Sequence, residues 1–252
     1  MRVRSGVELA SLTDIGCIRE NNEDSYIYWE PGRDDLFPQL GRLAAVADGM
    51  GGYQGGQIAS RMAVEIVSNT YAGSTVTDPQ DRLLGAFREA HHRIQECAGR
   101  SANLSGMGTT CTALVLIGNR LYFAHVGDSR LFLFRDGELE LLTSDHTLVA
   151  HLLNIGAIQP GEAEHHPQRH VLTAALGVRD EIQPHFPREP LSVHSGDVLL
   201  LCTDGLWGQV EDAEIKAVIG SHSPASACRE LVQLAMERGG PDNITLQVLR
   251  LN

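Results

Sequence analysis

The chain has 252 residues, 42% of them hydrophobic and 21% charged, which is the composition of a globular protein with one large domain or two small ones. Its 32 acidic residues outnumber its 20 basic residues, and the net charge of −12 argues against nucleic acid as a partner. No segment reaches the roughly 18 apolar residues of a membrane span, and the N-terminal residues lack the apolar core of a signal peptide, so we expect a cytoplasmic protein without membrane contact.

The pattern of the first hundred residues predicts one short strand and two helices. Residues 43–47 form a continuous apolar segment of strand length. Residues 58–67 carry apolar side chains at helical spacing. A second helix is predicted from Asp78-Pro79, where a capping residue precedes a proline, to Ala98.

From residue 111 to residue 142 the pattern changes to short apolar segments separated by turns. Strands are predicted at 111–117, 121–126, 131–134 and 139–142. Gly118-Asn119 and Asp136-Gly137 have the composition of two-residue hairpin turns. We therefore expect one antiparallel meander over this region.

The last part of the chain begins with a polar stretch, residues 155–169, whose Gly, Pro and His content predicts a surface excursion. Strands follow at 198–202 and 244–249, and a helix between them begins at Ser223-Pro224 and stops at Gly239-Gly240. Because helices and strands come in groups instead of alternating strictly, the predicted fold class is α+β.

Four aspartates stand where the predicted strands end or begin. Asp48, Asp128 and Asp204 each end an apolar segment, and Asp242 precedes one. Any one of them could be an ordinary turn residue, as Asp136 is. The end of an antiparallel strand lies beside the start of its neighbour, so we expect the four carboxylates to meet at one rim of a sheet.

A cluster of four carboxylates in a partly dry site repels itself and is tolerable only with bound cations. Ligation by oxygen alone favours Mg²⁺ or Mn²⁺ over zinc. The segment 48–56 is rich in glycine but lacks the lysine of a nucleotide-binding loop. A backbone carbonyl of Gly49 that binds a metal ion is the simpler interpretation.

Arg19, Glu23 and Asp24 form a second charged group upstream. They could be a solvated loop. Alternatively, Glu23 or Asp24 supports the metal ions from behind their ligands while the planar guanidinium of Arg19 binds a phosphate oxygen.

Cysteine and histidine offer weaker indications. The five cysteines are odd in number and widely spaced, which fits core residues better than disulfides or a thiolate metal site. His165, His166 and His170 lie within six positions. Their spacing suits tetrahedral zinc poorly, and we interpret them as exposed loop residues.

Seven segments, in order and over nearly the whole chain, resemble the metal-dependent Ser/Thr protein phosphatases of type 2C in their compact bacterial form. The segments are TDIGCIRENNEDS, VADGMGG, GTTCTALVL, AHVGDSRLFLFRDGELELLTSDHT, LTAALG, LLLCTDGLW and GGPDNIT. The resemblance implies a central antiparallel β-sandwich with a pair of helices on each side. It also implies a single catalytic domain over residues 1–252, with a flap beside the active site at about 150–169 that sets substrate preference.

The resemblance also implies a set of metal ligands. By position, Asp48 bridges two metal ions, and Gly49 supplies a carbonyl to one of them. Asp204 and Asp242 bind the other ion, and Asp128 joins Asp204 at a third, looser ion.

The same resemblance implies the roles of the remaining site residues. Arg19 matches the phosphate-binding arginine, and Glu23 and Asp24 match an acidic pair that contacts the metals largely through water. Eukaryotic relatives carry a histidine, the proposed proton donor to the leaving alcohol, where this chain has Met50. Many relatives have an arginine where this chain has Ala174.

The expected reaction is hydrolysis of phosphoserine and phosphothreonine in proteins, the products of a cognate Ser/Thr kinase, in signal transduction. Hydroxide shared by two Mn²⁺ or Mg²⁺ ions attacks phosphorus directly, while Arg19 and the ions neutralise the phosphoryl oxygens. A catalytically weak binding module with the same fold is one alternative, which the presence of all four aspartates disfavours. A hydrolase of small phosphate esters is another, because the core residues recognise only the phosphoryl group.

Overall fold

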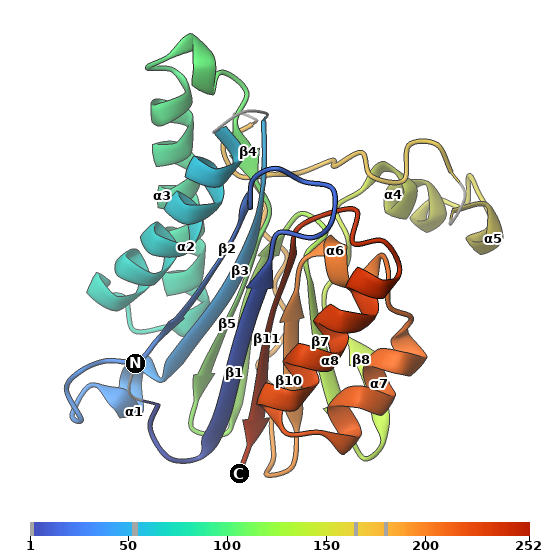
Figure 1. Cartoon of the computed structure of the whole chain (residues 1–252). Helices are drawn as coiled ribbons and strands as arrows, with labels where there is room; N and C mark the ends of the chain where they lie inside the picture. The colour runs from blue at the N-terminus through green and yellow to red at the C-terminus, as the bar shows by residue number, and fades with distance from the viewer. Residues whose placement is uncertain (1–2, 52–54, 164–165, 179–180) are drawn as a thin grey trace.

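The computed structural model describes residues 3–51, 55–163, 166–178 and 181–252. Two antiparallel sheets face each other in its centre, and helices cover the outer face of each sheet (Figure 1). The predicted α+β class and four-layer architecture are therefore confirmed. No helix among the residues described combines the length and the apolarity needed to cross a membrane.

Each sheet joins strands from distant parts of the chain. The first sheet has the order β1 (Val7–Asp14), β11 (Ile244–Leu251), β10 (Val198–Cys202), β7 (Arg130–Arg135) and β8 (Glu138–Leu141). The second has the order β2 (Asp24–Trp29), β3 (Arg42–Met50), β5 (Cys111–Ile117), β6 (Arg120–Val126) and β9 (Leu191–Ser192), and β4 (Gly108–Thr109) pairs with the end of β3.

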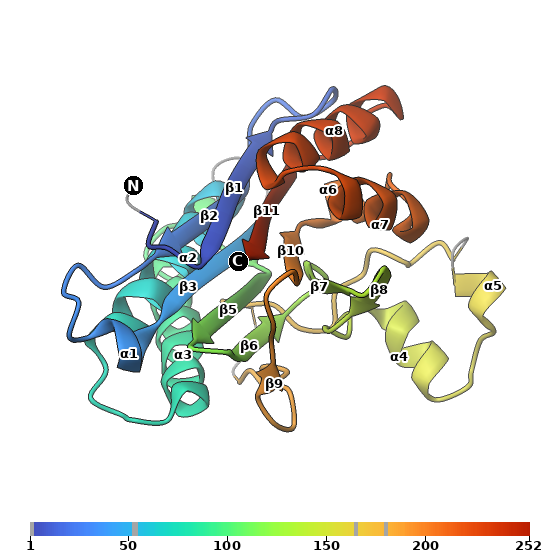
Figure 2. The same cartoon turned by 90° about the horizontal axis from the view of Figure 1, so that it is seen from below.

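The two helical layers are visible in Figures 1 and 2. Helices α2 (Gly55–Gly73) and α3 (Pro79–Ala98) cover the second sheet, and α7 (Asp212–Ser221) and α8 (Pro224–Glu237) cover the first. The remaining helices are short: α1 (Phe37–Leu40), η1 (Ala102–Leu104), α4 (Leu148–Asn154), α5 (Pro160–Ala163) and α6 (Asp204–Trp207).

Strand β3 shows why the central strands read as continuous apolar segments. Leu43, Ala45 and Ala47 pack into the core beneath α2 and α3, while Ala44 and Val46 pack into the core between the two sheets. A strand that is buried on both faces has no polar side to alternate with. The sequence pattern of β10 has the same cause, since its five residues are all buried.

The predicted single meander over residues 111–142 is wrong. β5 and β6 form one hairpin in the second sheet, and β7 and β8 form another in the first. The chain crosses between the sheets at residues 127–129, where Gly127 adopts a φ of 109° and a Cβ would lie 2.5 Å from the Thr110 side chain. The second hairpin turn is as expected, with positive φ at both Asp136 and Gly137.

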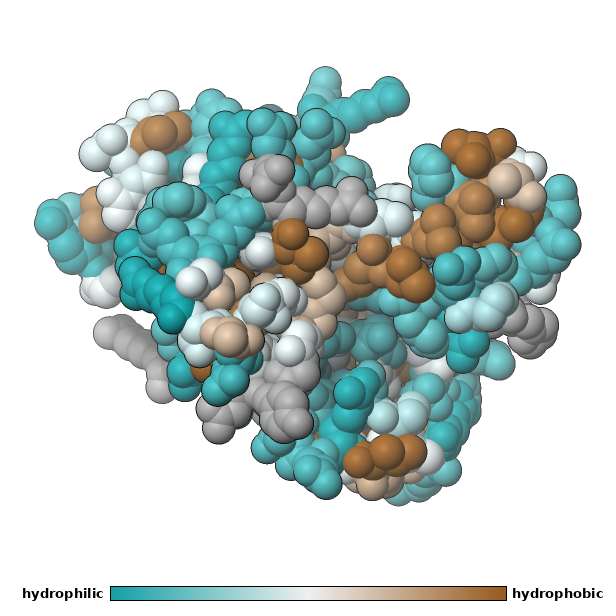
Figure 3. Space-filling view, turned by 90° about the horizontal axis from the view of Figure 1, so that it is seen from above, coloured by the Kyte–Doolittle hydropathy of each residue, from teal (hydrophilic) through white to brown (hydrophobic). Residues whose placement is uncertain are grey.

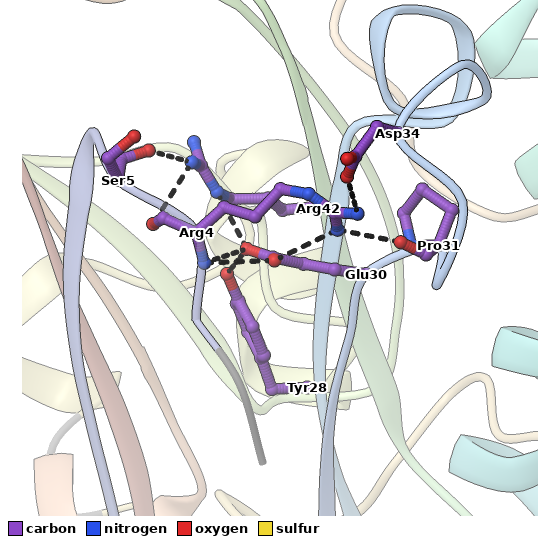
Figure 4. A network of polar contacts seen from close by, with 7 residues as sticks. All are labelled: Arg4, Ser5, Tyr28, Glu30, Pro31, Asp34 and Arg42. Carbon is purple, nitrogen blue, oxygen red and sulfur yellow. Dashed lines mark hydrogen bonds and ion pairs between the residues drawn. The ribbon is translucent and has the colours of Figure 1, made fainter.

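A buried polar network lies at the end of the sandwich where β3 begins (Figure 4). The carboxylate of Glu30, 3% exposed, accepts hydrogen bonds from the Tyr28 hydroxyl at 2.5 Å, Arg42 Nε at 2.9 Å and the Arg4 amide at 3.0 Å. Burial by itself would raise the pKa of Glu30, but the hydrogen bonds from Tyr28, Arg4 and Arg42 outweigh it and hold that pKa below its ordinary value. Arg42 also donates to the carbonyl of Ser5, so the network joins the segment before β1 to the second sheet.

We expect Glu30→Gln to lower the free energy of unfolding at pH 7 by about 2–4 kcal/mol, because it leaves the buried Arg42 without a counter-charge. Since the folded-state pKa of Glu30 is depressed, its stabilisation is present above about pH 4.3, the ordinary pKa of a glutamate, and is lost as pH falls through the folded-state value. Urea unfolding at neutral and acidic pH would show the deficit at neutral pH only. Asp34→Asn is the control: Asp34 pairs with Arg4 at 2.8 Å but is 95% exposed, so its loss should cost below about 1 kcal/mol. Equal effects of the two substitutions would contradict the assignment.

Candidate active site

A cavity of about 1360 Å³ lies at the opposite end of the sandwich, where β3 ends. Its walls combine both sheets with the start and end of the predicted flap. Figure 3 views the molecule from this end and shows apolar side chains gathered over the region of α4, beside the more polar body. Seven of the eight predicted site residues line the cavity: Arg19, Glu23, Asp48, Gly49, Asp128, Asp204 and Asp242.

The eighth residue, Asp24, lies beside Asp48 in the sheet and does not line the cavity. The two are paired across β2 and β3 in the antiparallel register, and Asp24 accepts a hydrogen bond from the Thr203 hydroxyl at 2.8 Å. Thr203 immediately precedes Asp204, so this hydrogen bond connects the two sheets within the site. Asp24 therefore contacts the segments that carry Asp48 and Asp204 without itself lining the cavity.

The aspartates converge as predicted, but not at the rim of one sheet. Asp48 belongs to the second sheet, whereas Asp204 follows β10 and Asp242 precedes β11 in the first. Asp128 lies in the crossing between the sheets. The predicted strand end at Asp48 is also wrong, because β3 continues to Met50 by pairing with β4.

Burial and mutual repulsion dominate the electrostatics of this cluster. Burial, followed by the charges of Asp24, Asp204 and Asp128, raises the pKa of Asp48 well above its ordinary value. Burial and the neighbouring Asp242 raise the pKa of Asp204, and burial together with Asp204 raises the pKa of Asp128 to about 8. Burial also raises the pKa of Asp24, by more than its hydrogen bonds lower it.

The donor set fits hard divalent cations that keep much of their water. Within the described residues, no group of three or more His, Cys, Asp or Glu side chains is arranged to hold a metal ion. Mg²⁺, however, is commonly held by one or two carboxylates with water in the other positions, and Mn²⁺ accepts the same ligands. Oδ1 of Asp204 is buried and has no hydrogen-bond partner in the described part of the chain, as an oxygen awaiting a cation would be.

Gly49 occupies a position that only glycine can fill. A Cβ there would lie 2.1 Å from the Gly56 carbonyl oxygen and 2.7 Å from that of Glu23. Its amide donates to the Glu23 carbonyl at 3.1 Å, which brings the segment of Glu23 against the end of β3. Residues 52–54 of the glycine-rich segment lie outside the described residues.

Arg19 lies at the edge of the cavity and pairs with one of the predicted ligands. Its terminal nitrogen donates to Oδ2 of Asp242 at 2.7 Å, and its side chain is 52% exposed. Burial raises the pKa of Glu23, which lies nearby. The structure thus places Arg19 and Glu23 beside the aspartates, with Arg19 on an exposed segment.

Backbone contacts fix the two ends of the predicted flap. Thr147 and Leu172 form an antiparallel bridge, and the Thr173 amide donates to the His146 carbonyl at 2.8 Å. Ala174 packs against the core beneath α2 and α3. Of the three clustered histidines, His170 lines the cavity, and His165 lies outside the described residues.

Sequence reasoning missed three residues that line the cavity: Arg130, Asp145 and Trp207. All three lie within the segments that carry the family resemblance. Arg130 follows the predicted ligand Asp128 by two positions, and Trp207 follows Asp204 by three. Pairing of β7 with β10 and with β8 inside the first sheet brings them into mutual contact.

Comparisons with known proteins agree with this geometry. A family model described as protein phosphatase 2C matches residues 20–240. Protein phosphatase PhpP of Streptococcus pneumoniae is 40% identical over 256 residues, which cover 98% of each protein. A serine/threonine phosphatase of S. agalactiae has a TM-score of 0.89 at 35% identity, covering 98% of this chain and 100% of its own. The catalytic domain of the serine/threonine protein phosphatase PstP, in complex with two manganese ions, has a TM-score of 0.83 at 34% identity, covering 98% of each chain.

We expect the metal-free protein to lose stability as pH rises. The folded-state pKa of Asp128, about 8, lies above the ordinary value of about 3.9, so the folded state holds the proton more tightly and is destabilised as pH rises between the two values. Asp128→Asn removes this charge and should raise the free energy of unfolding at pH 8.5 in EDTA by about 1–2 kcal/mol. Urea unfolding at pH 5.5 and 8.5 measures the effect. Asp136→Asn, in an exposed turn, is the control, and a less stable Asp128→Asn protein at pH 8.5 would contradict the expectation.

Proposed function

The chain belongs to the protein phosphatase 2C family, and from this premise we propose that it is a metal-dependent enzyme that hydrolyses phosphoserine and phosphothreonine in proteins. The observation that carries the proposal is the convergence, beside Arg19, of five aspartates from both sheets that repel one another. They are Asp24, Asp48, Asp128, Asp204 and Asp242. Such a cluster costs stability unless cations bind it, and a site of this kind suits a dianionic phosphate group.

We propose that the aspartates hold two Mn²⁺ or Mg²⁺ ions, with a third bound more weakly. Asp48 would be the shared ligand, because it comes from the second sheet and lies close enough to Asp204 and Asp128 to interact with both. Gly49 would contribute a carbonyl to one ion, Asp204 and Asp242 would bind the other, and Asp128 with Asp204 would bind the third. When bound, such ions polarise phosphoryl oxygens and lower the pKa of water.

Arg19 binds and orients the phosphate group. Its guanidinium has the planar fork that matches two phosphoryl oxygens, and its half-exposed position lets an incoming phosphate reach it. Its contact with Asp242 positions the fork at the edge of the cavity before substrate arrives. Glu23 and Asp24 hold the end of β3 in place through the backbone. The Glu23 carbonyl accepts from the Gly49 amide, and Asp24 pairs with Asp48 across β2 and β3.

The leaving alcohol needs a proton, and Met50 has none to give, although it lines the cavity. The proton therefore comes from water or from another residue of the cavity wall. His170, on the return segment of the flap, lines the cavity, and its charge lowers the pKa of Asp204.

The substrates we propose are Ser/Thr-phosphorylated proteins, the products of a cognate kinase, and the whole chain serves as one catalytic domain. Exposed apolar side chains on the flap segment favour a protein substrate: Ile155 and Val171 are exposed, and Leu153 and Leu172 close to them in sequence line the cavity. A cytoplasmic location is supported by the five cysteines, all of which are free thiols.

Metal removal tests the function directly. Purified protein in EDTA should not release phosphate from phosphoserine and phosphothreonine peptides, and Mn²⁺ should restore the release. Asp204→Asn, which keeps the shape of the side chain, should lower the restored activity at least about 100-fold. Phosphotyrosine peptides and p-nitrophenyl phosphate are the comparison substrates. Activity that survives chelation would contradict the metal dependence, and preference for the small ester would favour a small-molecule hydrolase.

Arg19→Ala should chiefly raise KM for a phosphopeptide, by about tenfold or more, because it removes charge-assisted hydrogen bonds worth about 1.5–3 kcal/mol. Arg19→Lys keeps the charge without the planar fork, so its KM should lie between those of the wild type and Arg19→Ala. Steady-state kinetics at saturating Mn²⁺ separate KM from kcat. An unchanged KM in Arg19→Ala would remove Arg19 from phosphate binding.

A further inference from the structure

Arg130, the first residue of β7, has contacts that the roles above do not use. Its Nε and terminal nitrogen donate to the two carboxylate oxygens of Asp145 at 3.2 and 2.8 Å, and both side chains are largely buried, at 18% and 14% exposure. On one face the guanidinium carbon lies 3.6 Å from the centre of the Trp207 ring. Only arginine offers a planar cation that both forks onto a carboxylate and stacks on an aromatic ring.

Trp207 carries this contact to two of the proposed metal ligands. It is the last residue of α6, the short helix that begins at Asp204. Its indole nitrogen donates to the backbone carbonyl of Asp128 at 3.0 Å. The position of the ring therefore sets the distance between the backbone of Asp128 and the helix of Asp204.

Asp145 carries the contact to the flap. The next residue, His146, donates its amide to the Gly127 carbonyl at 2.7 Å and accepts from the Gly127 amide through Nδ1 at 3.3 Å. Thr147 then caps α4, the first helix of the flap. Since Gly127 precedes Asp128, the contacts form a closed ring from Asp128 through the tryptophan, the arginine and the start of the flap back to Asp128.

We propose that Arg130 is a positioning residue that couples the start of the flap to Asp128 and Asp204. The bidentate pair with Asp145 fixes where the flap leaves the body, and the stack on Trp207 fixes the two aspartates relative to each other. The inference rests on the proposed function, because its chemical consequence is the affinity of the aspartates for metal ions. When the flap moves on binding a protein substrate, the positions of Asp128 and Asp204 change with it. By the same coupling, metal binding at these aspartates changes the position of the flap.

The same strand provides a matched control. Arg135, the last residue of β7, pairs with Asp197 through Nε at 2.9 Å and a terminal nitrogen at 2.5 Å, and Asp197 is buried. This pair has the same chemistry, but it lies at the far end of β7 from the cavity. Arg135→Lys should therefore cost stability without changing the site.

The test compares Arg130→Lys and Arg135→Lys by calorimetric titration with Mn²⁺, and by hydrogen exchange of residues 143–173 without metal. Arg130→Lys should raise the Kd for Mn²⁺ about tenfold or more and speed exchange at the start of the flap, whereas Arg135→Lys should leave both within about twofold of wild type. Trp207→Phe keeps a ring under Arg130 but loses the hydrogen bond to Asp128. It should weaken Mn²⁺ binding while exchange in the flap stays near wild type.

The outcomes separate this coupling from a role in folding alone. If Arg130→Lys and Arg135→Lys match in Mn²⁺ affinity and in flap exchange, Arg130 only stabilises the fold and the proposal is wrong. If Arg130→Lys does not fold, unchanged Mn²⁺ affinity in Trp207→Phe overturns it. If the wild type itself binds no Mn²⁺, the proposed function fails, and the metal-free exchange data still decide whether Arg130 holds the flap.

Discussion

Five aspartates that repel one another are held together at one end of the sandwich, and the two sheets supply the rigidity that keeps them there. Asp48 stands in a strand that is buried on both faces, and Asp204 follows another such strand. The cores on either side of these strands prevent the carboxylates from moving apart. The pKa values of Asp48, Asp128 and Asp204 are raised because the fold keeps these carboxylates buried and close to one another.

The two ends of β3 show opposite treatments of a buried carboxylate. At its beginning, Glu30 is surrounded by donors, and its pKa is lowered. At its end, Asp48 faces further carboxylates, and its pKa is raised. The first arrangement is complete within the chain and contributes stability. The second is incomplete without cations, which is the difference between a structural network and a site that does chemistry.

Sequence reasoning succeeded where the signal is local. The helix caps at Asp78 and Ser223 and the turn at Asp136-Gly137 lie where they were expected. It failed where the pairing strand is remote in sequence. Strand β1 was not predicted, because it is only half-buried and its pairing strand, β11, lies at the other end of the chain. Helix α7 was missed although Glu211 and Glu214 form a capping box. The aspartates were found because strand ends carry a sequence signature, whereas the Arg130 contacts exist only after β7 has paired with β10 and β8, which are remote or turn-linked segments of the first sheet.

The antiparallel bridge between Thr147 and Leu172 has an evolutionary consequence. It closes the flap at its neck, so the excursion beyond it can lengthen, shorten or change its chemistry without disturbing the register of any sheet strand. Loop-closure entropy rises only slowly with loop length, so such exchanges cost little stability. The segment between Thr147 and Leu172 can therefore vary while the strands that hold the aspartates keep their pairing.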